Sequence, residues 1–325
     1  MRISLVITTV VCLMASLFAH NSANAAETIR IGLIGLDSSH AVAFAKTINA
    51  KDSSPELQKA TVVAAFPGGS PDLPTSADRI EGFTKQIQDM GIEIVPSIDA
   101  LLKKVDAVIM NSVDGRVHLA QATPVLEAGI PIFVDKPITA SLEEAKQLIA
   151  LSEKTGTPFF SSSTLRYCQE VIDLKKEDVV GCVAYSPCKL DPTHPDLFWY
   201  GIHGVETLFT VMGPGCKSVQ RTQAEGVEIV TGVWEDGRVG TFRGIRDGSY
   251  GYGVVVFGKK NIELTKIRAN YNLLVVEIVK FFQTKEPPIS PAETLEIVAF
   301  MTAADMSRDA DGEAISLDRL LSDKK

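Results

Sequence analysis

The sequence lacks the patterns that mark fibrous, repetitive or disordered chains. It has no collagen-like period, no low-complexity tract, no long block of one charge and no solenoid repeat. It also has neither a G-x-x-x-x-G-K-[ST] loop for ATP nor a serine in a nucleophile-elbow pattern. What remains is a chain of 325 residues, 45% apolar and 22% charged, which is the composition of a globular protein of two ordinary domains.

Basic residues are scarce relative to acidic ones. Lys and Arg number 32 against 40 Asp and Glu, a net charge of −8 with histidine neutral. Nucleic acids and anionic lipids are bound through clustered Lys and Arg, so this balance argues against both partners. A small neutral or polar ligand fits the composition better.

The first residues are expected to be a leader rather than part of a fold. Arg2 precedes an almost uninterrupted apolar run over residues 3–19, and Ala23-Asn24-Ala25 has the small-residue pattern after which signal peptidase cuts. We expect residues 1–26 to be a signal peptide, so that the mature protein is exported, periplasmic or secreted, with no stable membrane anchor. The alternative is a retained anchor, because the run approaches the length that spans a bilayer.

Four cysteines lie beyond the leader. Export makes disulfides chemically possible, whereas a core of this size does not need them. Bridged cysteines and free buried cysteines therefore both stay open for Cys168, Cys182, Cys188 and Cys216.

From residue 27 to residue 163 the sequence alternates short β-branched runs with helical stretches. Strands that are apolar on both faces and alternate with helices are typical of a parallel sheet covered on both sides. Six such strands predict an α/β fold with an N-terminal Rossmann-type, doubly wound parallel sheet. The expected strands are 29–34, 60–66, 92–95, 106–110, 131–134 and 157–161, and the expected helices are 40–50, 77–90, 98–104, 118–128 and 142–154.

The pattern changes after residue 163, and residues 164–325 are expected to form a C-terminal α+β domain. Alternating apolar and polar residues predict an open, largely antiparallel sheet, followed by two helices. A late helix of such a fold often packs back on the first domain. The expected strands are 227–234, 238–245, 253–257 and 262–267, and the helices are 271–283 and 291–307.

Local signals support two boundaries in this second domain. Asp236 and Gly237 predict a two-residue hairpin turn in which both residues have positive φ. Ser290, Pro291 and Glu293 form the sequence of a capping box with proline at the first helical position.

A loop that could meet a dinucleotide follows the first strand. Such a site expects G-x-G-x-x-G, so that backbone amides and a helix N-terminus meet the pyrophosphate. This chain keeps Gly35, but Asp37 and His40 stand where the second and third glycines belong. Contact with phosphate through Asp37, Ser38, Ser39 and His40 and simple N-capping of the helix both stay open, and they are compatible.

The second strand ends without the acidic residue that usually accepts the ribose hydroxyls. Gly68, Gly69 and Ser70 follow it and offer amides and a hydroxyl to a ribose or a phosphate. The alternative is an ordinary turn.

Three motifs together resemble one enzyme family. Asp135-Lys136-Pro137 directly follows the fifth strand, Asn111 to His118 lies upstream, and Leu165-Arg166-Tyr167 lies downstream. With Ser307 and Gly312 near the end, these motifs resemble the Gfo/Idh/MocA oxidoreductases over nearly the whole chain beyond the leader. The resemblance implies a Rossmann domain, an open-sheet domain that forms the substrate pocket and often the oligomer interface, NAD or NADP as cofactor, and sugars or cyclitols as substrates.

The resemblance also implies roles for particular residues. Lys136 matches the family lysine that lies near the nicotinamide and the reacting hydroxyl, where it can donate or accept a proton if its pKa is lowered. Asp135 replaces the usual glutamate. Asn111 and His118 match positions beside the cofactor, after the fourth strand.

The second domain departs from the family motif D-x-x-x-H-x-x-D. His203 and Glu206 match its last two positions and lie on one helical face, so Glu206 is a candidate to orient His203. Trp199 stands in place of the first aspartate, where it can stack on a sugar ring. We expect Lys136 and His203 to be catalytic, and Arg166, Trp199, His203 and Glu206 to contact the substrate.

A metal site is an alternative interpretation of the histidines and carboxylates in this stretch. The spacing of His194 and His203 matches no common ligand pattern, with Asp191 and Asp196 nearby. No metal is therefore expected.

The sequence thus predicts an exported, homo-oligomeric NAD(P)-dependent oxidoreductase that acts on a carbohydrate or cyclitol hydroxyl. The alternative is a non-redox carbohydrate-binding protein on the same scaffold, a pseudoenzyme. Its support is that Asp37, His40 and Trp199 each replace a residue that the redox chemistry normally uses.

Overall fold

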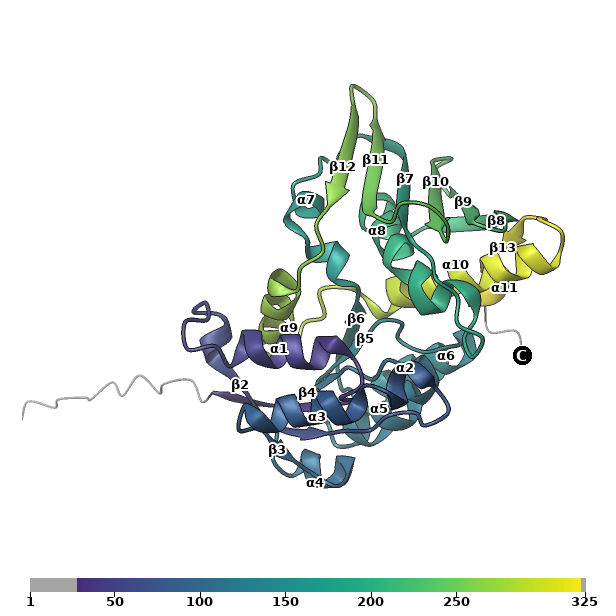
Figure 1. Cartoon of the computed structure of the whole chain (residues 1–325). Helices are drawn as coiled ribbons and strands as arrows, with labels where there is room; N and C mark the ends of the chain where they lie inside the picture. Colours follow the sequence, from purple (N-terminus) through teal and green to yellow (C-terminus); the bar gives the residue numbers. More distant parts are fainter. Residues whose placement is uncertain (1–27, 323–325) are drawn as a thin grey trace, which may run out of the picture.

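The computed structural model describes residues 28–322, which form two sheets with helices between and around them (Figure 1). The predicted signal peptide, residues 1–26, lies outside the described residues. Within residues 28–322, no helix is long and apolar enough to cross a membrane.

The first sheet has six parallel strands in the order β3-β2-β1-β4-β5-β6. This is the doubly wound Rossmann arrangement, so the predicted α/β class is confirmed. Its order reverses between β1 and β4, and ligands of such sheets bind outside the carboxyl ends of the strands at that point. The strands are β1 (Ile29–Ile34), β2 (Ala60–Phe66), β3 (Glu93–Ile94), β4 (Ala107–Met110), β5 (Ile132–Asp135) and β6 (Phe159–Ser162).

Helices between these strands cover the sheet. They begin at polar caps such as Ser141, which accepts a hydrogen bond from the amide of Glu144 and starts α6. Gly156 ends α6 with φ of +67°, a backbone conformation that glycine adopts at little cost. The helices are α1 (Ser39–Ile48), α2 (Pro74–Ala77), α3 (Ile80–Asp89), α4 (Ile98–Leu102), α5 (His118–Glu127) and α6 (Leu142–Thr155).

The prediction of one helix over residues 77–90 is wrong in its first part. It begins earlier, at Pro74, and is broken into α2 and α3 at residues 78–79. Proline suits the first helical position because its missing amide hydrogen would have no helical partner there. The break places Arg79 at the N-cap of α3, where its side chain reaches the pocket described below.

The second sheet has seven strands in the order β12-β11-β7-β10-β9-β8-β13. Only the β10–β7 pair is parallel among its described pairs, so the prediction of a largely antiparallel sheet is confirmed. The strands are β7 (Val179–Pro187), β8 (Cys216–Ala224), β9 (Val227–Trp234), β10 (Val239–Ile245), β11 (Tyr252–Gly258), β12 (Ile262–Ile267) and β13 (Ile315–Ser316).

The hairpin between β9 and β10 differs from the predicted two-residue turn. The amide of Gly237 donates to the carbonyl of Trp234 over 2.9 Å, and the amide of Trp234 donates to the carbonyl of Arg238. Gly237 has φ of +83°, while Asp236 is not among the residues with positive φ. The loop is therefore one residue longer, with a single left-handed glycine at its end.

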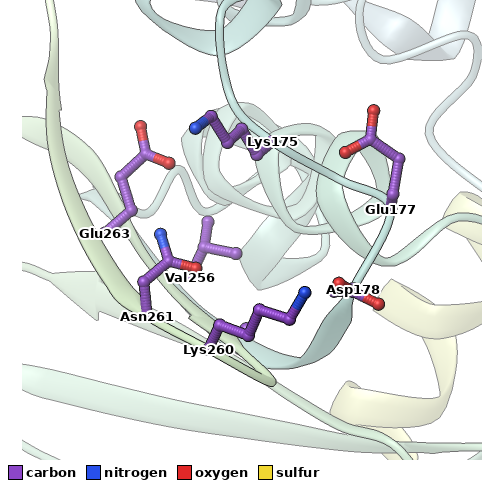
Figure 2. Close-up of a pocket in the computed structure, with 8 residues that line it drawn as sticks. Lys175, Glu177, Asp178, Val256, Lys260, Asn261 and Glu263 are labelled. Atoms are coloured by element: carbon purple, nitrogen blue, oxygen red, sulfur yellow. The ribbon is translucent and has the colours of Figure 1, made fainter.

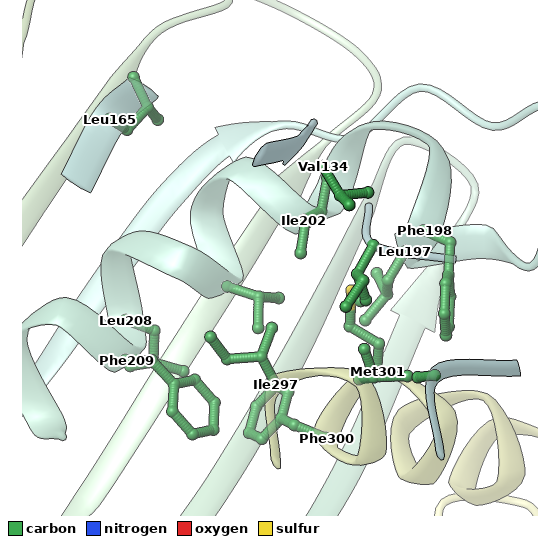
Figure 3. Close-up of a cluster of buried hydrophobic side chains, with 14 of the residues drawn as sticks. Val134, Leu165, Leu197, Phe198, Ile202, Leu208, Phe209, Ile297, Phe300 and Met301 are labelled. Atoms are coloured by element: carbon green, nitrogen blue, oxygen red, sulfur yellow. The ribbon is translucent and has the colours of Figure 1, made fainter. Parts of the chain in front are cut away.

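Side chains of two helices, among them Phe209 and Phe300, meet in one buried apolar cluster (Figure 3). α8 (Ile202–Met212) packs on β7 and β10, while α10 (Pro291–Asp309) packs on β8 and on α6 of the first domain. Phe209 of α8 and Phe300 of α10 meet edge to face with ring centroids 5.5 Å apart. Ser290 caps α10 as predicted by accepting from the amide of Glu293, but the Glu293 carboxylate binds Arg166 instead of completing the capping box.

The helix α9 (Asn272–Thr284) returns to the first domain and lies beside α1 (Figure 1). Its buried face joins the core on that side of the Rossmann sheet, where Phe281 meets Phe160 edge to face at 5.0 Å. The two halves therefore share a hydrophobic core. The remaining short helices are α7 (Gln169–Ile172) and α11 (Asp318–Leu321).

The four described cysteines are free and buried. Burial raises the pKa of both Cys182 and Cys216 to about 12, so these thiols stay protonated and unreactive. Cys188 donates to the buried carboxylate of Glu228 over 3.0 Å. Of the two states left open by the sequence, the structure contains free thiols.

Candidate functional site

A pocket of about 300 Å³ lies where the ends of β1, β4 and β5 face the second domain. That is the lower end of the range of about 300–1,000 Å³ typical of small-molecule sites. It coincides with the point where the strand order of the Rossmann sheet reverses. The pocket is lined by Ser38, Ser39, His40, Thr75, Arg79, Val113, Lys136, Lys189, Trp199, Tyr200, His203 and Tyr271.

Asp135, the last residue of β5, anchors one wall of this pocket. Its carboxylate contacts Nδ1 of His40 at 2.5 Å and accepts from the amide of Lys136 at 2.8 Å. Burial alone would raise the pKa of Asp135, but His40 and Lys136 outweigh it and lower that pKa to about 2. An ionised carboxylate thus ties the start of α1 to the residue that follows β5.

Lys136 enters the pocket with its ammonium group 6.0 Å from the centre of the Tyr200 ring. Burial lowers the pKa of Lys136, the charge of Arg79 lowers it further, and Asp135 only partly opposes them. A lysine with a lowered pKa can accept a proton as well as donate one.

His203, near the start of α8, faces Lys136 from the second domain. Its Nδ1 lies 2.8 Å from the hydroxyl of Ser163, which leaves Nε2 for a ligand. Burial lowers the pKa of His203 well below 6.5, and the charges of Lys136 and His40 add to this effect. The imidazole is therefore neutral near pH 7, and Ser163, rather than the predicted Glu206, orients it.

Arg166 and Glu206 do not line the pocket. The Arg166 guanidinium binds the Glu206 carboxylate at 2.8 Å and the Glu293 carboxylate at 2.7 Å. Burial raises the pKa of Glu206, although Arg166 opposes this. These predicted substrate contacts form an internal ion-pair network that joins α8 and α10 to the turn after β6. Trp199, in contrast, does line the pocket, with its ring 4.9 Å from that of His194.

The loop after β1 is covered by the chain itself. Asp37 has no exposed surface, and its carboxylate accepts from the hydroxyl of Ser76 at 2.6 Å and from the amide of Val113 at 3.0 Å. The same Ser76 hydroxyl accepts from the amide of Ser70 at 2.8 Å. The helix α2 is thereby held over the position of the second glycine, and Ser38 caps α1 by accepting from the amide of His40.

Glycines pack this loop closely against its neighbours. Gly35 has φ of +84°, and a Cβ there would lie 2.3 Å from the backbone nitrogen of Ser112. A Cβ on Gly68 would lie 3.6 Å from the Cα of Gly35, and Gly69 also has a positive φ. The glycines after β2 are therefore explained by the positive φ of a turn, the alternative that the sequence left open.

Two further predicted cofactor residues lie in the loop after β4. Asn111 is fully buried, and both atoms of its side-chain amide contact no partner among the described residues. His118 is also buried, with Nδ1 and Nε2 near the carbonyl oxygens of Ile138 and Ser112. His118 thus joins two loops, whereas Asn111 keeps hydrogen-bonding capacity for a ligand.

The residues of the alternative metal site are dispersed into separate ion pairs. His194 lies near Asp114 and Asp191, while Asp196 binds Arg221 at 2.8 Å. Across residues 28–322, no three histidine, cysteine or acidic side chains are grouped to hold a metal ion.

Several lining residues were missed from the sequence. Arg79 and Thr75 come from the broken helix after β2, Lys189 follows β7, and Tyr271 precedes α9. None belongs to a local motif, so no signal short of the fold itself would have placed them in one pocket.

A second cavity, of about 340 Å³, lies at the edge of the other sheet and is unlike the first (Figure 2). Its lysines and carboxylates, among them Lys175, Glu177 and Lys260, are exposed and of both signs. Solvent therefore satisfies these groups, and nothing in this cavity indicates chemistry.

The fold and the pocket define a two-domain protein of the dinucleotide-dependent type. Residues 29–163 match the profile of the Gfo/Idh/MocA family, an oxidoreductase family with an NAD-binding Rossmann fold. The match covers the first domain of the chain, and the second domain lies outside it. The resemblance recognised from the motifs and the expected NAD-type cofactor class are both confirmed at the level of the family.

Known relatives match only in part. The chain is 34% identical over 83 residues to an uncharacterised oxidoreductase, YdgJ, of Escherichia coli, which is 25% of this chain and 24% of that protein. It is 39% identical over 59 residues to UDP-N-acetylglucosamine 3-dehydrogenase of Acidithiobacillus ferrooxidans, 18% of each. The matches thus span at most about a quarter of these relatives.

The whole fold is similar to that of scyllo-inositol dehydrogenase from Lactobacillus casei, solved with NAD(H) and scyllo-inositol. The TM-score is 0.71 at 15% identity, over 90% of this chain and 100% of that one. At this identity the likeness describes the fold alone.

The pocket fits part of a dinucleotide well. Ser39 and His40 open the N-terminus of α1 to the pocket, where helix amides favour phosphate, and Lys136 lines the same pocket. The side-chain amide of Asn111, which follows β4, is buried without a partner among the described residues. The position of the second glycine is covered, because Ser76 holds α2 against Asp37. These residues would hold the cofactor if α2 shifts away from the loop.

The neutral state of His203 can be tested directly. Lys136→Met removes a neighbouring positive charge, so the pKa of His203 should rise, yet stay below 6.5 because burial persists. Imidazole proton resonances followed by NMR against pH measure this. Lys104→Met is the matched control, since Lys104 pairs with Glu93 on the distant rim of the Rossmann sheet. An unchanged His203 titration in Lys136→Met would contradict the assigned cause.

Proposed function

We propose that this protein is an exported NAD(P)-dependent oxidoreductase that acts on a hydroxyl group of a carbohydrate or cyclitol. The observation that carries the proposal is the meeting of Lys136 and His203, from different domains, in one pocket at the switch point of the Rossmann sheet. The lowered pKa of Lys136 favours a neutral amine that can accept a proton, and the lowered pKa of His203 keeps its imidazole neutral.

The proton chemistry follows from this arrangement. A bound nicotinamide supplies the acceptor for the hydride that leaves the substrate carbon. Lys136, when neutral, accepts the proton of the substrate hydroxyl at Nζ. The neutral His203 contacts the oxygen of the same hydroxyl through Nε2. Ser163 holds the His203 ring in this orientation through Nδ1.

The substrate class is supported by the pocket lining and by the relatives. Trp199 and Tyr200 present aromatic faces beside His203, and such faces stack on sugar rings. One relative by sequence is a dehydrogenase of a nucleotide-linked amino sugar, and a protein of similar fold was solved with scyllo-inositol. A single sugar or cyclitol ring is the size of ligand that this pocket favours.

The test is calorimetric titration of the protein from residue 27 with NAD and NADP, then turnover on a panel of sugars and cyclitols. We expect dinucleotide binding, and Lys136→Ala or His203→Ala should each lower kcat by about 10²–10⁴-fold. Lys260→Ala, at the other cavity, is the control and should keep full activity. A folded protein that binds neither dinucleotide and turns over no substrate would sink the proposal.

A second candidate function is a non-redox carbohydrate-binding protein on the same scaffold. The specific observation in its favour is that Asp37 and Ser76 cover the phosphate-binding loop. A pseudoenzyme has no need of that loop, whereas an active enzyme must uncover it.

The covered loop leads to a prediction that distinguishes the oxidoreductase from the non-redox carbohydrate-binding protein. Asp37→Gly and Ser76→Ala each release α2, so NAD(P) affinity should rise by about tenfold if the cover opposes binding. Calorimetry measures this change. Ser97→Ala also removes a serine hydroxyl with a hydrogen-bonding role, the N-cap of α4, but away from the pocket, and should leave NAD(P) affinity unchanged. Equal NAD(P) affinities in the wild type and in the three variants would show that α2 does not obstruct dinucleotide binding.

The export and homo-oligomerisation that we propose rest on separate features. The leader pattern supports export, while the open face of the second sheet carries exposed apolar side chains that a partner copy would cover. The apolar side chains on this sheet that are more than a third exposed include Val233, Val239, Phe257, Ile262 and Leu264.

Protein recovered from the exported fraction should begin at residue 26 or 27 and sediment as a homo-oligomer. N-terminal sequencing and sedimentation velocity measure the two properties. Protein that keeps residues 1–25 would contradict export by cleavage, and a monomer at micromolar concentration would contradict the assigned interface.

A further inference from the structure

Three cations from different parts of the chain meet in the pocket. Arg79 comes from the start of α3, Lys136 follows β5, and Lys189 follows β7 of the second domain. The side chains that line the pocket include no carboxylate.

None of these cations has an ion-pair partner among the described residues. The Arg79 Nε donates to the carbonyl of Thr75, and its Nη2 is buried without a partner. Lys136 and Lys189 contact the rings of Tyr200 and Tyr250. Buried cations in proteins are normally paired with carboxylates.

Elsewhere the same chain follows that rule. Arg166 binds Glu206 and Glu293, and the fully buried Arg221 binds Asp196, Glu228 and Asp305. Arg79, whose Nη2 is buried without a partner among the described residues, departs from this rule at the pocket, whereas Lys189 is exposed there and stays hydrated.

The carboxylates nearest the pocket are already engaged. Asp135 pairs with His40, and Asp37 is bound to Ser76 and to the amide of Val113. Asp114 pairs with Arg116 and lies 3.1 Å from His194. The charge of Asp135 reaches Lys136, but no described carboxylate pairs with Arg79 or Lys189, so a bound anion would pair with those two.

Lys189 lies on the side of the pocket that belongs to the second domain. It also lines an adjoining cavity of about 430 Å³ that contains Tyr200, Tyr250 and Tyr252 and no residue of the Rossmann domain. Lys189 thus lines both cavities, at the boundary between them. Arg79 and Lys136 line the same pocket, and the charge of Arg79 lowers the pKa of that lysine.

We infer that the substrate carries an oxyanion, a carboxylate or a phosphate, which Arg79 and Lys189 bind while its hydroxyl lies between Lys136 and His203. An acidic sugar, such as a uronate, or a sugar phosphate has this chemistry. The planar guanidinium of Arg79 matches an oxyanion through two parallel hydrogen bonds, and Lys189 adds a point charge. The inference rests on the proposed function, because it names the substrate class of the same pocket.

The test is calorimetric titration with D-glucuronate, D-glucose 6-phosphate, D-glucose and NAD of the wild type, Arg79→Gln and Lys189→Gln. Lys175→Gln, at the second cavity, is the matched control. We expect one of the acidic sugars to bind about tenfold or more tightly than glucose. Arg79→Gln and Lys189→Gln should each lower the affinity for the acidic sugar about tenfold, whereas glucose and NAD binding should change little.

Each other outcome has a definite meaning. Preference for glucuronate identifies a carboxylate site, and preference for the phosphate ester identifies a phosphate site. Equal binding of acidic and neutral sugars overturns the inference. Loss of NAD affinity in Arg79→Gln and Lys189→Gln, with unchanged sugar binding, also overturns it, because the cations then serve the dinucleotide phosphates and the proposed function stands. Acidic-sugar binding without any dinucleotide binding would instead remove the proposed function and keep the anion site.

Discussion

The buried carboxylate of Asp135 is the constraint on which the rest of the site depends. A buried ion costs several kcal/mol unless its partners compensate it, and here His40 and the backbone of Lys136 do so. The contact joins α1 to the end of β5 across the switch point of the sheet. It also directs Lys136 toward His203 of the second domain, so the position of one acid sets the geometry of both proton-transfer groups.

The Rossmann half was predictable because its strands are apolar on both faces and end at clear breaks. The strand 60–66 was predicted to the residue, as was 262–267 in the second sheet. The strand β8 was missed, since it carries polar residues and Arg221, which would be expected in solvent. Arg221 is buried only because carboxylates distant in the sequence reach it, and no local pattern reports such partners.

The site was predictable to the extent that its residues belong to motifs. Lys136, His203, Trp199 and His40 do line one pocket, as the motifs indicated. Spacing alone misassigned the partner of His203: Glu206 lies one turn away on α8, but Arg166 takes its carboxylate. Arg79 lies at the break in the helix predicted over 77–90, and no local pattern predicted either that break or the Ser76–Asp37 contact beside it.

The return of α9 to the first domain has a consequence for biosynthesis. Leu274, Ile278 and Phe281 complete the core on one side of a sheet whose first strand begins at residue 29. A ribosome or a secretion channel delivers the chain from its N-terminus. The amino-terminal half therefore emerges with this apolar face uncovered and cannot complete its core until α9, Asn272–Thr284, has been delivered. The first domain therefore completes its core only together with the second. Until then its uncovered apolar face is available to chaperones.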